Sequence, residues 1–294
     1  MADVPHILVC LAWLGELSKQ QVQRLCVPQQ TAGNVGRLLH ELRDEGYLTK
    51  REWAVPRRGG GPPERQAAMW SLTRSGQQSV RDAPLYPQSV AKLRARRVLP
   101  HDAMTAEALV CVIEAGRKVG LSSIWLEHEV RLDPARSRPV MDAFIVVRTG
   151  GSAAAPNWVP WTLDPRTGEE KSGRLALEND RGTEGRREIA GKAVSYQAAG
   201  TPAWLARYGA FPIPTWVAPN AARLRSILAW WAPLWPEGRW LMTTDQAIRR
   251  DQWIEFQQGQ VCERGLFRRP GAPVPTWLPV ADWLALPGVF DSGE

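Results

Sequence analysis

The stretch Leu175-Ala-Leu-Glu178-Asn-Asp180-Arg-Gly-Thr183 places two acids at the end of an apolar run. A run of this kind predicts a buried strand. Side chains alternate along a strand, so Glu178 and Asp180 leave the same face. Two carboxylates on one face can share a cation, because Mg²⁺ and similar hard ions prefer oxygen ligands. The sequence therefore predicts a strand whose end is a candidate cation site.

The segment that follows predicts a helix that is capped by Thr183 or a neighbour and runs to about Ala199. In it, Glu188, Lys192 and Tyr196 fall four residues apart and share one helical stripe. A strand that ends in two acids and leads to a helix with an inward lysine is typical of metal-dependent nucleases. We therefore expect a nucleic-acid partner.

The net charge is concentrated at one end of the chain. The 294 residues carry 37 Lys and Arg against 30 Asp and Glu, for a net charge of +7. Residues 1–100 hold 15 basic and 8 acidic residues, and residues 101–294 hold 22 of each. An excess of this kind attracts a phosphate backbone, or less readily an acidic membrane surface. The length suits two domains.

The four cysteines are scattered among apolar residues and form no Cys-x-x-Cys pair. We expect reduced thiols in or near the core and a cytoplasmic protein. The histidines are too dispersed to predict a structural zinc site. No apolar run is long enough to cross a bilayer, and the first residues lack the features of a secretion signal.

The first domain is predicted to begin with three helices. Apolar spacing indicates a helix over 7–14, and Ser18 with Gln21 forms a capping-box start for a second helix that ends near Cys26. A third helix is expected from Thr31 to Gly46, with Asn34 and Arg37 on its outer face. Strands are then expected over 47–55 and 68–73, joined by a basic, glycine-rich loop.

Three helices followed by a hairpin predict a winged helix-turn-helix over residues 1–83. The phrases at 42–51 and 70–76 resemble the third helix and the wing of that family. The start of the third helix would meet base edges, and basic residues of the hairpin would hold phosphates. The candidate DNA-binding residues are Gln29, Gln30, Thr31, Asn34, Arg37, Lys50, Arg57, Arg58 and Arg65. The alternative is a protein-docking module, and the basic excess favours duplex DNA.

Residues 84–100 read as a basic linker helix, and residues 101–294 as an α/β domain. Its predicted order is helix, three strands, helix, strand, helix, strand, which gives a mixed sheet flanked by helices. The third strand is expected in a hairpin with 158–163, and a further strand over 211–217. We expect the Trp-, Pro- and Gly-rich tail after Trp253 to pack irregularly over the core. The tryptophans that concentrate after Trp204, among them Trp231 and Trp240, are expected to fill the core or form oligomer contacts rather than to stack on bases.

The order helix, three-strand meander, helix, strand resembles the PD-(D/E)XK nuclease-like superfamily. The resemblance implies that Asp142, Glu178, Asp180 and Lys192 are the catalytic residues, with the three acids holding Mg²⁺ or Mn²⁺. Of the strand acids Glu127 and Glu129, Glu129 is the better candidate for an additional ligand. Met141 stands where a proline is expected, and an aspartate stands where the third-strand lysine should be. Lys192 either replaces that lysine or is a salt-bridge partner of Glu178. If the site is inactive, no cofactor is expected.

At a finer level the chain resembles the bacterial replication-relaxation family of plasmid and mobile-element proteins over about residues 5–245. Its resemblance is carried by His101 and by the segments around Trp125, Asp142, Glu178 and Lys192, with Phe211-Pro and Asn220-x-x-Arg223 beyond them. The histidine is interpreted as a satisfied polar residue near a helix start rather than as a metal ligand.

Three functions are compatible with these features. The first is a DNA-binding protein of a plasmid or other mobile element that acts in replication, DNA relaxation or its regulation. The second is an active Mg²⁺-dependent DNA endonuclease. The third is a transcriptional regulator or protein-docking module. The expected partners are double-stranded DNA and replication or mobile-element proteins, without a membrane; a palindromic site would favour a homodimer.

Overall fold

A computed structural model of the chain describes residues 3–52, 54–55, 64–65, 68–82, 100–118, 121–131, 140–149, 172–199, 202, 205, 212–266 and 276–285. Several predictions fall outside this part of the chain. They are Arg57 and Arg58, the linker over 84–99, the strand over 158–163 and Phe211. The side chains of Arg65, His101 and Glu129 also lie outside the described part. The described chain separates into two compact units, Met1–Val110 and Cys111–Glu294, and the division falls inside helix α5 (Pro100–Arg117).

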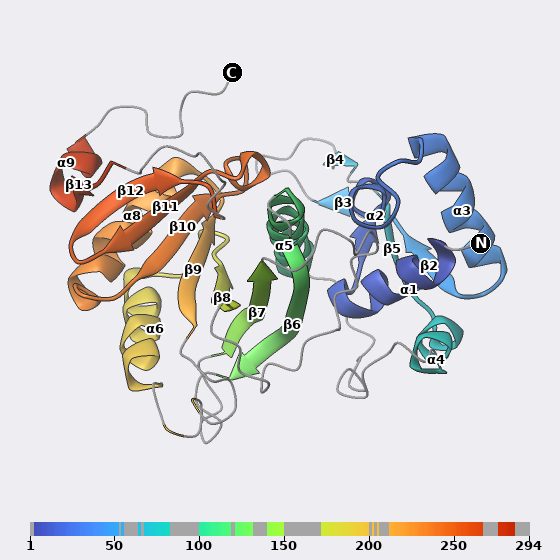
Figure 1. The fold of residues 1–294 in the computed structure, drawn as a ribbon, viewed down its shortest axis with the longest axis horizontal. Coiled ribbons are helices and arrows are strands. Elements are labelled where there is room, and N and C mark those ends of the chain that lie inside the picture. Colours follow the sequence, from blue (N-terminus) through green and yellow to red (C-terminus); the bar gives the residue numbers. More distant parts are fainter. Residues whose placement is uncertain are drawn as a thin grey trace. The chain divides into compact units, whose positions relative to one another are not determined.

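The first unit combines helices with a small antiparallel sheet (Figure 1). Helices α1 (Asp3–Leu14), α2 (Lys19–Cys26) and α3 (Ala32–Asp44) are followed by α4 (Arg74–Asp82). The sheet has the order β1 (Leu17–Ser18), β5 (Met69–Leu72), β2 (Leu48–Arg51), and all its pairs are antiparallel. Strands β3 (Ala54–Val55) and β4 (Glu64–Arg65) form a separate two-stranded ribbon. The prediction of a single strand over 47–55 is therefore wrong, because the pairing of β2 with β5 stops after Arg51.

Local sequence signals explain where these helices begin. The Ser18 side chain accepts a hydrogen bond from the Gln21 backbone, and the Gln21 side chain accepts one from the Ser18 backbone, so the predicted capping box is confirmed. Thr31 caps α3 by accepting a hydrogen bond from the Asn34 backbone. Helix α3 buries Val35 and two leucines against the unit, which leaves its polar side exposed.

The second unit is built on one sheet of eight strands whose spatial order follows the sequence, β6 to β13. The central strands are β8 (Ser172–Asn179), β9 (Ile213–Ala218) and β10 (Trp240–Thr244), which run parallel. Antiparallel pairs extend both edges: β6 (Leu121–Arg131) with β7 (Val140–Thr149) on one side, and β11 (Trp253–Gln257) with β12 (Gln260–Arg264) and β13 (Leu278–Pro279) on the other.

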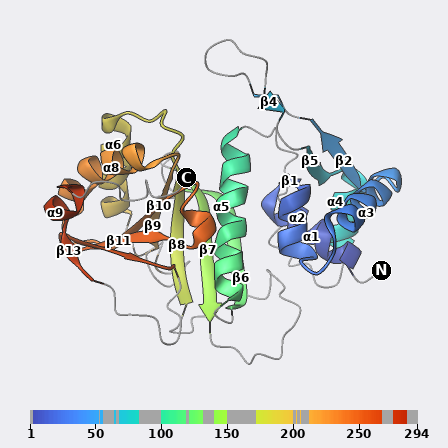
Figure 2. The same ribbon diagram turned by 90° about the horizontal axis from the view of Figure 1, so that it is seen from above.

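Helices α6 (Arg186–Ala198) and α8 (Ala221–Trp231) make the two crossovers between the parallel strands. They contact each other and lie on one face of the sheet (Figure 2). This is the arrangement expected when both crossovers have the same hand. The predicted order of helices and strands is confirmed from α5 to β10, and the chain is an α/β protein as expected. Helix α6 begins at Arg186 with Gly185 as its cap, two residues after Thr183, and the Glu188 side chain accepts a hydrogen bond from the Gly185 backbone.

The prediction that the chain packs irregularly after Trp253 is wrong. Strands β11 and β12 form a hairpin whose turn residues, Gln258 and Gly259, both have positive φ, as a tight hairpin turn requires. The alternating pattern was not visible in the sequence because Trp253 to Phe256 are buried on both faces, including the acid Glu255. That carboxylate is held by Arg239 and by Arg264, whose Nη1 lies 3.0 Å from Glu255 Oε2. The short strand β13 and helix α9 (Val280–Ala285) follow.

The core of the second unit is rich in tryptophan, as predicted. Trp231 lies at the centre of an aromatic cluster and has no solvent exposure. Its ring is 5.1 Å from that of Trp216 and 5.9 Å from those of Trp235 and Trp240. These contacts hold α8 on the sheet and leave the ends of the parallel strands in a fixed position. Among the described residues, no helix combines the length and the apolar character needed to cross a bilayer.

The close approach of α4 to Tyr47, the residue before β2, leaves no room for a side chain at Gly76. A Cβ atom there would lie 2.2 Å from the Tyr47 carbonyl oxygen, which is backbone and cannot swing away. We expect Gly76→Ala to lower the free energy of unfolding of the first unit by about 1–3 kcal/mol. Chemical denaturation of the full chain, followed by circular dichroism, measures this change.

Gly33→Ala in α3 is the matched control. The nearest atom to its Cβ would be Thr31 Oγ1 at 3.9 Å, so the substitution fits and should stabilise the helix by up to about 1 kcal/mol. Equal effects of the two substitutions would contradict the tight packing of Gly76.

Candidate functional site

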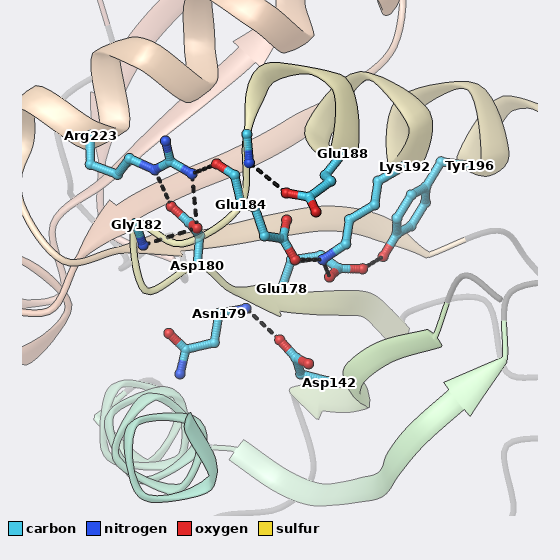
Figure 3. Close-up of polar contacts among 11 residues, drawn as sticks. Asp142, Glu178, Asn179, Asp180, Gly182, Glu184, Glu188, Lys192, Tyr196 and Arg223 are labelled. Carbon is cyan, nitrogen blue, oxygen red and sulfur yellow. Dashed lines mark hydrogen bonds and ion pairs between the residues drawn. The ribbon is translucent and has the colours of Figure 1, made fainter. Parts of the chain in front are cut away.

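The candidate site lies at the carboxyl end of β8, where α6 and the start of α8 meet the parallel strands (Figure 3). Glu178 is its centre and is completely buried. Glu178 Oε2 is 2.8 Å from Lys192 Nζ, and Glu178 Oε1 accepts a hydrogen bond of 2.7 Å from the Tyr196 hydroxyl. Both carboxylate oxygens therefore have partners on α6, and these partners lie on the helical stripe that the four-residue spacing of Lys192 and Tyr196 predicted.

Lys192 bridges two acids. Its Nζ lies 2.6 Å from Glu184 Oε1 in addition to the contact with Glu178, and 5.3 Å from the centre of the Trp216 ring. Of the two roles that the sequence left open for this lysine, the structure shows the salt bridge with Glu178. Glu184 was not identified as a site residue, because it lies in the irregular segment before α6, where no periodicity indicates which way a side chain points.

The environment changes the acid strength of Glu178. The pKa of this carboxyl is raised to about 7, mainly by burial and also by the nearby Asp142, while Lys192 and Tyr196 act in the opposite direction. The pKa of Lys192 is raised although burial alone would lower it, because Glu178 and Glu184 favour its charged form. Burial and Glu178 also raise the pKa of Tyr196. At neutral pH the lysine is thus charged, and Glu178 is close to its midpoint of titration.

Asp180 has a different set of partners from Glu178. It is buried, and the Arg223 guanidinium contacts both of its oxygens, with a distance of 3.0 Å from Nη2 to Oδ1. The Gly182 backbone donates a further hydrogen bond of 3.1 Å to the same Oδ1. Arg223 Nη2 also donates to the Glu184 carbonyl, so one arginine joins the end of β8, the loop before α6 and the first turn of α8. The predicted site did not include Arg223, although its position three residues after the cap Asn220 was a visible signal.

Asp142 lies on β7 next to the end of β8. The register that pairs Ala143 with Leu177 places Asp142 beside Glu178. The Asp142 Oδ2 atom accepts a hydrogen bond of 2.6 Å from the Asn179 backbone, where ladder pairing between the two strands has ended. The carboxylate thus substitutes for a main-chain acceptor at this point of the sheet.

The three acids predicted as metal ligands are neighbours, but their oxygens do not gather around one point. In the described part of the chain they do not form a group whose ligand atoms all lie within 4.8 Å of one another. Glu178 is engaged by Lys192 and Tyr196, and Asp180 is engaged by Arg223. As arranged here, these side chains form two ion-paired clusters and do not fit a three-carboxylate Mg²⁺ site.

A second candidate surface is the start of α3. Gln29, Thr31, Asn34 and Arg37 are exposed, and Gln30 is half-buried. The Thr31 hydroxyl caps the helix, and the Asn34 amide donates to Gln30 Oε1 over 3.3 Å. The Arg37 side chain is 74% exposed, and its contact with Glu41 is long, at 3.9 Å. Lys50 on β2 lies 3.6 Å from Glu52. The first turns of α3 therefore present amide and guanidinium groups to solvent.

Comparison with known proteins identifies the family. The chain matches the model of the replication-relaxation family over residues 8–213, which is most of its length, and it belongs to that family. The match runs through both units and includes Asp142, Glu178, Asp180 and Lys192. Membership indicates a role in replication or relaxation of a plasmid or other mobile element. No curated protein and no solved structure shows significant similarity to the chain.

The raised pKa of Glu178 predicts how stability depends on pH. Its folded pKa of about 7 exceeds the ordinary value of 4.5, so the folded state binds the proton more tightly than the unfolded state. The contribution to stability is present below pH 4.5 and is lost as pH rises through 7. We expect the wild-type protein to lose on the order of 1–3 kcal/mol between pH 5 and pH 8 relative to Glu178→Gln.

Denaturation curves of both proteins across this pH range provide the measurement. Glu263→Gln is the control, because Glu263 is an exposed acid on β12 and should leave the slope unchanged. Parallel pH profiles of the wild type and Glu178→Gln would show that Glu178 does not titrate in this range.

Proposed function

We propose that the protein binds duplex DNA of a plasmid or other mobile element through the first unit and acts there in replication, DNA relaxation or its regulation. The observation that carries this proposal is the exposed start of α3. Its polar residues Gln29, Asn34 and Arg37 face solvent, while Val35 and Leu39 are buried against the unit. Amide and guanidinium groups are those that read base edges in the major groove.

The topology supports the same proposal. The elements of the first unit follow the order helix, short strand, two helices and two paired strands, with β1 and β2 on either side of β5. This is the arrangement expected of a winged helix-turn-helix, in which α3 is the recognition helix and the ribbon of β3 and β4 extends the wing. The excess of 15 basic over 8 acidic residues in positions 1–100 supplies attraction to phosphate.

For the second unit we propose a nuclease-like scaffold whose charges serve the fold. The elements from α5 to β9 follow the order of the PD-(D/E)XK core, and the acids at the end of β8 are paired with Lys192 and Arg223. Removing one partner of a buried ion pair costs much more than an exposed pair contributes. On this proposal the unit assists assembly on DNA, with replication or mobile-element proteins as its partners, and cuts no bond.

The DNA-binding proposal predicts a specific effect of Arg37→Ala. We expect affinity for duplex DNA to fall by about 5- to 100-fold, because a base or phosphate contact of an arginine contributes about 1–3 kcal/mol. If Arg37 contacts phosphate, the dependence of log K on log salt concentration should also become shallower by about 1. Fluorescence anisotropy of a labelled plasmid fragment at several salt concentrations measures both quantities.

Arg43→Ala is the matched control. Arg43 lies in the last turn of the same helix, is exposed, and pairs with Asp44 at 2.8 Å, so its loss should leave binding nearly unchanged. Equal affinity of the wild type and Arg37→Ala would favour a protein-docking or regulatory role for this unit.

A second candidate function is a Mg²⁺- or Mn²⁺-dependent DNA endonuclease. The observation that favours it is the position of Asp142 beside Glu178, with Lys192 2.8 Å from that glutamate. Two carboxylates and one lysine on neighbouring elements are the residue types such chemistry uses. Metal binding would first have to separate Glu178 from Lys192 or Tyr196, and Asp180 would also have to leave Arg223 in order to take part.

Cleavage assays separate the two functions. The scaffold proposal predicts that supercoiled, linear, single-stranded and branched DNA stay intact during incubation with the protein and Mg²⁺ or Mn²⁺. Gel electrophoresis of the products provides the measurement. Metal-dependent cutting that is lost in Asp142→Asn and kept in Glu263→Gln would establish the endonuclease and overturn the scaffold proposal.

A further inference from the structure

Three side chains in the first unit bring nitrogen and sulfur atoms together away from the sites described above. His6 and Cys10 lie one turn apart on α1, and Cys26 is the last residue of α2. Their ligand atoms all lie within 4.8 Å of one another, and Cys10 Sγ is 3.9 Å from His6 Nε2. Within the described part of the chain, these are the metal-ligating side chains whose ligand atoms lie close together.

The sequence pattern did not predict this cluster. The cysteines carry no paired motif and the histidines are dispersed, and on that ground no zinc site was expected. The expectation overlooked the packing of α1 against α2, which places residues 16 positions apart side by side. His6 and Cys10 meet because residues four apart share one face of a helix.

We propose that His6, Cys10 and Cys26 form a binding site for a soft, thiophilic cation, with Zn²⁺ as the reference ion. Two thiolates and an imidazole are ligands that such ions prefer, and the set contains no oxygen donor for a hard ion such as Mg²⁺. Ligand atoms around tetrahedral zinc lie about 3.5–3.8 Å apart. The observed 3.9 Å between Cys10 and His6 is close to that spacing, and the other separations need adjustments of no more than about 1 Å.

The two thiols are buried more deeply than the imidazole. Cys10 and Cys26 are 1% and 8% exposed, whereas His6 is half-buried. Three protein ligands leave a fourth position of the tetrahedron for water or another ligand. Metal binding to thiols releases protons, so the affinity is expected to rise with pH.

The site connects two helices next to the recognition helix. Cys26 is followed by a turn in which the Gln30 backbone donates a hydrogen bond of 2.9 Å to the Val27 carbonyl, and Thr31 then caps α3. A cation that ties Cys26 to α1 fixes the chain just before α3. On the proposed DNA-binding function, occupancy of the site would thereby hold Gln29 and Gln30 in place.

Titration of the reduced, metal-free full-length protein with Co²⁺ tests the site directly. We expect one ion per chain, with an intense visible spectrum typical of tetrahedral coordination and a thiolate-to-cobalt charge-transfer band. Zn²⁺ should displace the cobalt. Cys26→Ser should reduce the charge-transfer band to about half and weaken binding at least 10-fold, as loss of one of two thiolate ligands requires.

Matched variants distinguish the site from adventitious binding. Cys262→Ser removes a buried thiol of the second unit and should leave the cobalt spectrum unchanged. His6→Ala removes a half-buried ligand, and we expect it to weaken binding without preventing folding. The assay contains no DNA, so its outcome is independent of the proposed DNA-binding function.

Two outcomes would overturn the proposal. One is the absence of a thiolate-to-cobalt band in the folded wild-type protein, which needs no variant to interpret. The other is an unchanged band in a folded Cys10→Ser/Cys26→Ser protein. A protein that takes up no ion and forms a Cys10–Cys26 disulfide on mild oxidation would show a redox pair in place of a cation site.

Discussion

The contact of the buried Glu178 with Lys192 and Tyr196 is the interaction that joins α6 to the sheet of the second unit. Glu178 has no contact with solvent, so its charge requires a partner, and Lys192 supplies one from the helix that connects β8 to β9. The same lysine engages Glu184 at the entrance to that helix. Lys192 thus connects α6 both to the end of β8 and to the segment before the helix.

Arg223 forms a similar ion pair on the next described helix, α8, where it pairs with the buried Asp180. Its guanidinium holds Asp180 and the Glu184 carbonyl, and so joins the end of β8 to the start of α8. Trp231 at the other end of α8 packs among aromatic rings over the same sheet. Buried charge at one end of the helices and aromatic packing at the other hold the two crossovers and keep three parallel strands in register.

The two units use charge in opposite ways. Residues 101–294 hold equal numbers of acidic and basic residues, and three acids of the second unit, Glu178, Asp180 and Glu255, are buried and paired internally. The first unit has excess positive charge, and the Arg37 side chain on α3 is largely exposed. This difference supports the proposal that the first unit binds a polyanion. In the second unit the charged side chains instead form internal ion pairs. It also explains why acids typical of a nuclease are compatible with a structural role.

The sequence by itself determined the elements from α5 to β10, the caps of α2 and α3, and the stripe of Lys192 and Tyr196, because these depend on periodicity and local hydrogen bonds. Only the tertiary structure decided which acidic side chain each lysine or arginine contacts. Arg223 pairs with Asp180 across 43 residues, and Cys10 lies near Cys26 through helix packing. Such pairings depend on distances between elements, which no pattern within a single element specifies.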